Sequence, residues 1–159
     1  MANAGTFTIA AAKTIDSLTG AGGTTLGANT LTIGDASNSS GTYTGVASGT
    51  GGITTAGTGT LTLGGVNTYT GATTIGAGST LALDATGTIA DSSGVANAGT
   101  FTIAAAKTID SLTGAGGTTL NGTLTIGDAS NSSGTYTGVA PVARADHQRR
   151  RRHLDFGWG

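Results

Sequence analysis

The chain has 159 residues, the length of one domain, and a composition far from that of an ordinary globular protein. Charged residues make up 9% of it, against about 25% in a typical domain. Gly supplies 30 residues and Thr 33, while Glu and Cys do not occur. This composition excludes a disulfide framework and thiolate metal sites, and the scarcity of Glu, Lys, Gln and Arg argues against a helical protein.

The remaining composition favours β-structure. β-branched Thr, Ile and Val are plentiful, and they suit a pleated surface. Hydrophobic residues reach 36% and the mean hydropathy is +0.09, which is unlike a disordered chain. The sequence contains neither an apolar run of the roughly 20 residues that a membrane-spanning helix needs nor an N-terminal signal segment. An all-β fold is predicted.

Four short segments alternate polar and apolar residues, which is the pattern of a strand with one buried face. They are residues 6–9 (TFTI), 30–33 (TLTI), 60–63 (TLTL) and 80–83 (TLAL). Clusters of Gly, Asn, Asp and Ser between them indicate turns. The segments lie roughly 20 to 30 residues apart, with shorter strand-like pieces between, and this spacing matches one coil of a solenoid.

A longer repeat contains these segments. Residues 2–26 recur unchanged at 96–120, and residues 30–47 recur at 123–140. The offset is 94 and then 93, because one residue is missing between the two blocks of the second copy. The unit is therefore about 94 residues long, and the chain holds about one and a half copies.

A stacked solenoid explains how so few apolar residues could make a core. One coil offers a few Leu, Ile or Val side chains, which cannot offset an ordering cost of roughly 1–2 kcal/mol per residue. Coils stacked about 4.8 Å apart would bury a continuous apolar column and leave outward ladders of Thr. A β-sandwich is the alternative fold, since alternation alone does not separate the two. The predicted inward residues are Phe7, Ile9, Ile15, Leu18, Leu31, Ile33, Leu61, Leu63, Ile75, Leu81, Leu83, Ile89 and their copies in the second unit.

Residues 59–83 (GTLTLGGVNTYTGATTIGAGSTLAL) resemble the autotransporter-associated β-strand repeat, also called the passenger-associated transport repeat. That family has the pattern G-x-L-x-L-x-G-x-N-T-Y-[ST]-G-x-T-x-I, followed by a Gly turn and a second L-x-L. The residues that match are Gly59, Leu61, Leu63, Gly65, Asn67, Thr68, Tyr69, Thr70, Gly71, Thr73 and Ile75. Asn67 and Tyr69 are expected to be structural, Asn67 in a turn or a ladder and Tyr69 as a cap on the apolar column.

The resemblance implies a right-handed parallel β-helix in the secreted passenger of a bacterial autotransporter. Such passengers are adhesins or cell-surface structures, associated with the outer membrane, and this repeat is linked to their passage and folding there. The expected partners are an unknown surface or host ligand and a translocating β-barrel outside this chain. Open coil ends also predict self-association, because unpaired strand edges accept further strands.

Residues 1–140 contain no His, Cys, Glu or Arg, so a Ser-His-Asp triad is excluded there. Any carboxylate pair for glycoside hydrolysis would have to come from Asp. Asp16 with Asp110, and Asp35 with Asp128, are repeat copies, as are Lys13 and Lys107. This favours scaffold residues over one catalytic pair, so we expect no enzyme, cofactor or metal site. Residues 35–41 (DASNSSG) faintly resemble a calcium loop but lack its carboxylates, and an Asx or Ser turn is favoured.

The composition changes after Ala140, which divides the chain into a solenoid over 1–140 and a basic tail over 141–159. Arg149, Arg150, Arg151 and Arg152 could bind phosphates or an anionic membrane. However, residues 153–159, translated one nucleotide later with suitable codons, give the Thr-Leu-Thr-Leu-Gly-Gly of 60–65 at the repeat offset, so the tail is interpreted as a frame-shifted repeat. Residues 1–140 carry two Lys and six Asp, and this net charge of −4 argues against nucleic-acid binding. A truncated gene fragment without independent function, or a weak nucleic-acid or membrane binder acting through the Arg run, remain the alternatives.

Overall fold

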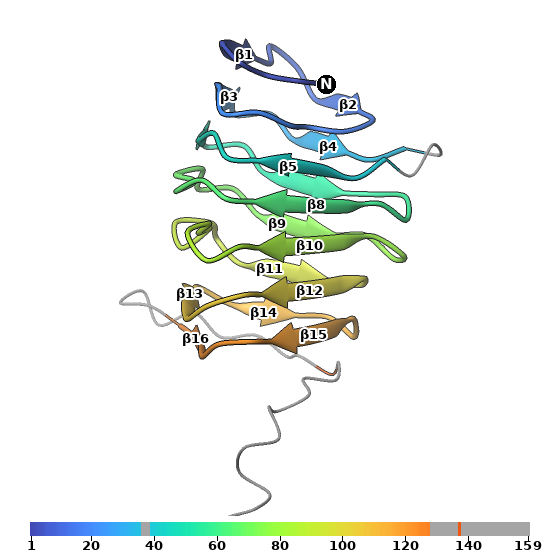
Figure 1. Ribbon diagram of the computed structural model, residues 1–159, viewed down its shortest axis with the longest axis vertical. Coiled ribbons are helices and arrows are strands. Elements are labelled where there is room, and N and C mark those ends of the chain that lie inside the picture. Colours follow the sequence, from blue (N-terminus) through green and yellow to red (C-terminus); the bar gives the residue numbers. More distant parts are fainter. Residues whose placement is uncertain (36–38, 128–136, 138–159) are drawn as a thin grey trace, which may run out of the picture.

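The structure is a computed structural model that describes residues 1–35, 39–127 and 137. The chain winds into a β-solenoid of about six turns, without a helix among the described residues (Figure 1). Every pairing between described strands is parallel and joins strands of successive coils. The all-β solenoid prediction is therefore confirmed, and the β-sandwich alternative is wrong because it needs antiparallel neighbours. The predicted tail, residues 141–159 with Arg149, Arg150, Arg151 and Arg152, lies outside the described residues.

Each coil visits three columns of strands in a fixed order, and we number the columns by that order. The first column is a five-stranded sheet along one side of the stack. Its strands are β5 (Gly41–Tyr43), β8 (Thr60–Leu63), β10 (Thr80–Leu83), β12 (Thr100–Ile103) and β15 (Gly117–Leu120). Single bridges continue the column toward the N-terminus, from Tyr43 to Gly20 and from Thr19 to Ala2.

The second column holds two shorter sheets, visible above and below one another at the left of Figure 1. Their strands are β1 (Thr6–Thr8), β3 (Gly23–Gly27) and β6 (Ala47–Gly49), and then β13 (Lys107–Ile109) and β16 (Leu124–Ile126). Backbone contacts continue the column between them. The Thr68 amide donates to the Ala47 carbonyl at 2.9 Å, and Val66 bridges to Thr88.

The third column is a six-stranded sheet. Its strands are β2 (Lys13–Ile15), β4 (Leu31–Ile33), β7 (Ile53–Thr55), β9 (Thr73–Ile75), β11 (Val95–Asn97) and β14 (Leu112–Thr113). The central residue of each of the first four strands is Thr, and Thr14, Thr32, Thr54 and Thr74 stand in register. This is one of the outward Thr ladders that the alternation predicted.

The coils differ in length because the corners between columns vary. In the first coil Thr6 pairs with Gly23, whereas in the next coil Thr24 pairs with Ala47, so the second of these coils is the longer. The coils that begin at β8 and β10 are equal in length, since Thr80 pairs in the same register with Thr60 before it and Thr100 after it. A strand segment needs only an apolar inner face and a pairing partner, so these differences are absorbed in Gly-rich corners.

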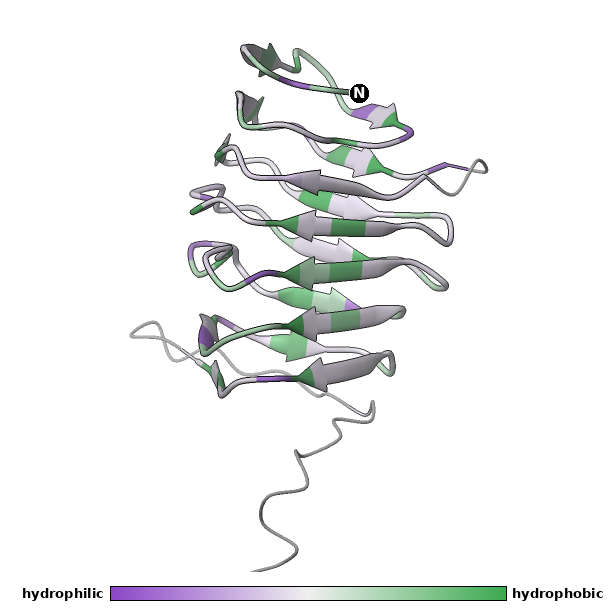
Figure 2. Ribbon diagram, viewed as in Figure 1, coloured by the Kyte–Doolittle hydropathy of each residue, from purple (hydrophilic) through white to green (hydrophobic). Residues whose placement is uncertain are grey.

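The core is a single stack of apolar side chains enclosed by the three columns of strands, and apolar positions recur strand after strand in Figure 2. Ten of the twelve inward positions predicted in the first unit are buried. Phe7 and Ile15 are only partly buried against the core, because β1 and β2 are terminal strands of their sheets. Ile126, the copy of Ile33, was predicted to be buried and is 51% exposed, since β16 is also a terminal strand. Leu26, Tyr43, Ile53 and Val95 are further buried residues outside the predicted set.

The two copies of the repeat lie in different columns. Ala2 starts the first copy in the first column, whereas its copy Ala96 lies in β11, in the third column. Likewise β1 lies in the second column and its copy β12 in the first, and β2 lies in the third column and its copy β13 in the second. The unit therefore spans four and two-thirds turns, so the second copy is rotated by one column relative to the first.

Candidate functional site

The motif at 59–75 occupies most of one coil, from β8 through the second column to β9. Leu61, Leu63 and Ile75 point into the core and are nearly inaccessible. Asn67, Tyr69 and Thr73 also point inward, and all three are at most 2% exposed. Thr68 and Thr70 are exposed between them. The motif thus alternates along its whole length, with polar side chains occupying inner positions.

Asn67 joins three successive coils. Its Nδ2 donates to the Gly65 carbonyl at 3.0 Å within its own turn and to the Thr88 carbonyl at 3.2 Å in the next coil. Its Oδ1 accepts from the Ala47 amide of the preceding coil at 2.9 Å. Asn67 therefore bonds both within its own turn and to the neighbouring coils, and its side chain satisfies backbone groups that the second column leaves without strand pairing.

Tyr69 was expected to cap the apolar column, but it lies inside the column, 1% exposed. Its phenol oxygen is 2.7 Å from the Thr73 hydroxyl, which is 2.9 Å from the Ser92 hydroxyl. Ser92 in turn donates to the Gly71 carbonyl at 2.9 Å. We call these three side chains, Tyr69, Thr73 and Ser92, the hydroxyl relay.

The direction of the hydrogen bonds in the relay follows from chemistry. A carbonyl only accepts, so the Ser92 proton points to Gly71 and the Ser92 oxygen accepts from Thr73. The Thr73 proton is then used, so Thr73 accepts from Tyr69. Burial raises the pKa of the Tyr69 phenol well above its ordinary value, with the Thr73 hydrogen bond opposing this in part. The phenol is therefore held as a neutral donor within its own coil, and the Thr73–Ser92 hydrogen bond joins that coil to the next.

Two Gly residues of the motif are required by close approach between coils. A Cβ added to Gly65 would collide with the Gly45 carbonyl oxygen, and one added to Gly71 would collide with the backbone of Gly51. Both Gly residues therefore let successive corners stack at strand spacing.

Similar inward polar side chains recur elsewhere. The Tyr43 phenol donates to the Gly22 carbonyl at 2.7 Å and lies 2.9 Å from the Thr24 hydroxyl. The Thr55 and Ser79 hydroxyls are 2.7 Å apart. None of these contacts was predicted, because Thr was assigned to outward ladders and Ser to turns. A signal was available, since Thr24, Thr55 and Thr73 each stand at an inward position of the alternation.

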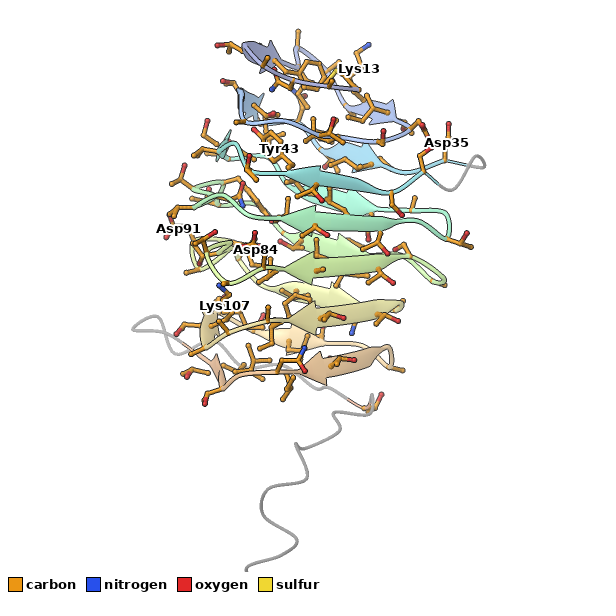
Figure 3. The ribbon with its side chains drawn as sticks, viewed as in Figure 1. Lys13, Asp35, Tyr43, Asp84, Asp91 and Lys107 are labelled. Carbon is orange, nitrogen blue, oxygen red and sulfur yellow. The ribbon has the colours of Figure 1, made fainter. Side chains whose placement is uncertain are left out.

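The clearest electrostatic feature is the turn after β10. The Asp84 carboxylate accepts from the Gly87 amide at 2.7 Å and the Thr86 amide at 2.8 Å. The Gly87 and Thr86 hydrogen bonds, with a contribution from Lys107, lower the pKa of this carboxyl, although its partial burial acts in the opposite direction. Lys107 is 8% exposed, and its Nζ donates to the Ala85 carbonyl of the same turn at 3.0 Å (Figure 3). Its copy Lys13 lies exposed in the first coil.

The outer face of the first column carries an open hollow of about 410 Å³. Its lining is hydroxyl-bearing or Gly, and no titratable side chain belongs to it: Thr19, Ser40, Gly41, Thr42, Thr60 and Thr62. Such a surface can offer hydrogen bonds but no acid, base or nucleophile of shifted pKa.

The other candidate residues are dispersed. Asp35 is exposed at the end of β4, and residues 36–38 of the segment compared with a calcium loop (35–41) lie outside the described residues. Within residues 1–35, 39–127 and 137, the structure shows neither a group of three or more potential metal ligands nor a helix able to cross a membrane. In the same part of the chain, every buried side-chain nitrogen and oxygen has a hydrogen-bond partner.

Comparison of the chain with protein-family models, curated proteins and solved structures finds no match. The resemblance to an autotransporter passenger therefore depends on the residues at 59–83 and on the fold.

Proposed function

We propose that this chain is a non-enzymatic structural segment of a bacterial surface protein, the stalk or scaffold of an autotransporter passenger, secreted and associated with the outer membrane. The observation that carries the proposal is the uninterrupted stacking of about six turns around one core. At about 4.8 Å per turn such a stack is about 29 Å long, and each further unit of four and two-thirds turns would add about 22 Å. A repeat of this kind is a device for extending a surface protein in one direction.

The hydrogen-bonded polar side chains inside the core support the proposed role as a stalk. Asn67 and the hydroxyl relay bond coil to coil within the core, so neighbouring turns are linked by side chains as well as by strand pairing. Buried polar groups that are fully satisfied specify one register and resist sliding of one turn over the next. An extended surface structure needs this resistance, since a slipped turn would displace every turn beyond it.

Passage through the outer membrane is the more specific part of the proposal. Contacts in the solenoid join residues of adjacent coils, as in the pairing of Thr60 with Thr80. A coil can therefore fold as soon as it emerges beside the preceding one, without waiting for the rest of the chain. We propose that residues 59–75 form such a folding unit, in which Asn67 bonds to the coils on either side and Tyr69 supports the Thr73 bond to the next coil.

The test is surface display. The full chain is expressed between a bacterial signal peptide and a translocating β-barrel, and added protease reports its arrival outside the cell. Replacing the inward pair Asn67 and Tyr69 by Ala should slow arrival and leave the segment protease-sensitive. Replacing the exposed pair Thr68 and Thr70 by Ala is the matched control and should change neither. Equal behaviour of the two double variants would refute the proposed role of the motif.

A further inference from the structure

The two copies of the repeat differ at one corner. Between its two identical blocks the first copy has Gly-Ala-Asn at 27–29, whereas the second has only Asn121 and Gly122. The shorter version creates the one Asn-Gly sequence in the chain. This corner joins β15 to β16, and it is fixed to the preceding coil by the Asn121 amide, which donates to the Ile103 carbonyl at 3.0 Å.

The other Asn residues that the structure describes are held by their side chains. Three of them are at most 7% exposed and donate to backbone carbonyls of a neighbouring coil. The fourth is half-buried and donates to the preceding coil at 3.4 Å. These residues are Asn3, Asn67, Asn97 and, last, Asn29. Asn121 differs from all four, because it is exposed and its side-chain amide bonds to no described residue.

An Asn side chain can react with the main-chain amide of the residue that follows it. Here the Gly122 nitrogen attacks Asn121 Cγ and forms a new C–N bond, while the bond from Cγ to Nδ2 breaks. The Nδ2 group leaves as ammonia with the proton that the Gly122 nitrogen gives up. Water then opens the cyclic succinimide at either carbonyl, leaving aspartate or isoaspartate. The reaction consumes water and releases ammonia, so it needs no other reactant.

The Gly122 amide is available for this attack. Gly has no side chain to obstruct the approach, and it allows wide rotation of the main chain. In the described ranges 1–35, 39–127 and 137, the Gly122 amide donates to no carbonyl. We propose that Asn121 is a site of spontaneous covalent modification, at which the Gly122 nitrogen converts it to aspartate and isoaspartate.

The reaction changes the corner in two ways. Both products place a negative charge on a corner that was neutral, and isoaspartate also lengthens the main chain between β15 and β16 by a methylene carbon. Space for the longer chain is limited, because a Cβ added to Gly122 would already collide with the Ala105 backbone. We therefore expect isoaspartate to displace the corner and to weaken the pairing of β16 with β13. The first copy, in which Asn29 is followed by Thr30, keeps its corner.

The test compares the folded chain with the same chain in guanidinium chloride. Both samples are incubated at neutral pH, and tandem mass spectrometry of peptides follows the conversion of each Asn with time. Asn97, 1% exposed, can react only after its coil opens. Its conversion should be slower in the folded chain by at least about tenfold, the factor that an opening cost of about 1.4 kcal/mol gives. Asn121 should convert at nearly the same rate in both samples.

The first copy supplies the matched control. Replacing Asn121 and Gly122 by Gly-Ala-Asn restores the corner of residues 27–29 and should remove isoaspartate from this corner, with the circular dichroism spectrum retained. If that insertion prevents folding, Asn121→Ser keeps the length of the corner and removes the reacting amide. Protection of Asn121 by tenfold or more in the folded chain, or isoaspartate that persists in Asn121→Ser, would overturn the proposal.

Discussion

Removing the central hydroxyl of the relay tests whether buried hydrogen bonds hold the coils together. Thr73→Val keeps the branched shape of the side chain and replaces its hydroxyl with a methyl group. In the native chain Thr73 accepts from Tyr69 and donates to Ser92. The variant leaves the Tyr69 phenol as a donor without an acceptor, 1% exposed. Ser92 loses an incoming bond but still donates to Gly71.

The expected cost follows from these roles. A buried donor left without a partner costs about 1–3 kcal/mol of stability, so Thr73→Val should lower the free energy of unfolding by about 2 kcal/mol. Tyr69→Phe removes the donor and leaves Thr73 still donating to Ser92, which should cost about 1 kcal/mol. In the double variant no orphaned phenol remains, so its cost should be less than the sum of the two single costs. Thr74→Val, in the same strand but facing outward, should be close to neutral.

Urea unfolding followed by far-ultraviolet circular dichroism measures all four variants, at protein concentrations low enough to avoid association. The diagnostic quantity is the difference between Thr73→Val and Thr74→Val. If the two variants unfold at the same urea concentration, or if the costs in the double variant add without coupling, the relay does not stabilise the stack and the reasoning fails.

Three further predictions use other contacts. Gly22→Ala should destabilise the junction of the first two coils by at least about 1 kcal/mol, because the added Cβ would collide with the Gly5 carbonyl oxygen. Gly23→Ala is the matched control and should leave stability unchanged, since no heavy atom lies within 4 Å of its added Cβ. Thermal unfolding of the two variants measures the difference. Stability should decline above about pH 10, where the unfolded phenol ionises and the buried one does not, and Tyr69→Phe should reduce that decline in alkaline melts. Asp84 should act in the opposite direction: its pKa is lowered in the fold, so its contribution is present above the unfolded value and disappears as acid protonates the folded carboxylate. Acid titration of Asp84→Asn should therefore show a shallower loss of stability than the parent, and an unchanged profile would contradict the turn geometry.

Much of the local structure could be predicted from the sequence. Alternation identified the strands at 60–63 and 80–83 and their inward Leu residues, because a strand with one solvent-exposed face alternates polar and apolar side chains. The motif singled out Asn67 as a structural residue in a turn or a ladder, and its hydrogen bonds lie within its own turn and to both neighbouring coils. The prediction failed for Tyr69 and Thr73, since polar side chains were assigned to the ends and surface of the column. A hydroxyl becomes acceptable inside a solenoid only when the next coil supplies its partner, as Ser92 does for Thr73, and local sequence does not reveal which residue that will be.

The two copies of the repeat separate what sequence determines from what tertiary structure determines. Both copies make the same strand pairs in the same register: Thr6 with Gly23 and Thr100 with Gly117, Lys13 with Leu31 and Lys107 with Leu124. The sequence by itself specifies these neighbours, because both partners lie within the repeated unit and each strand presents the same apolar face.

The column in which a strand lies, and whether its outer side is covered, are decided only by the whole stack. A column offers each strand the same environment, an apolar interior and a parallel neighbour, so the local sequence has no means of selecting one. The column in which a strand lies is set by how many turns the chain has completed before it. Because the repeat unit makes four and two-thirds turns, every strand of the second copy lies one column away from its counterpart in the first. Lys13 is exposed in the first coil, whereas its copy Lys107 is buried and donates to the Ala85 carbonyl of the coil before it. The burial of an identical side chain therefore depends on the neighbouring coil and not on the residue itself.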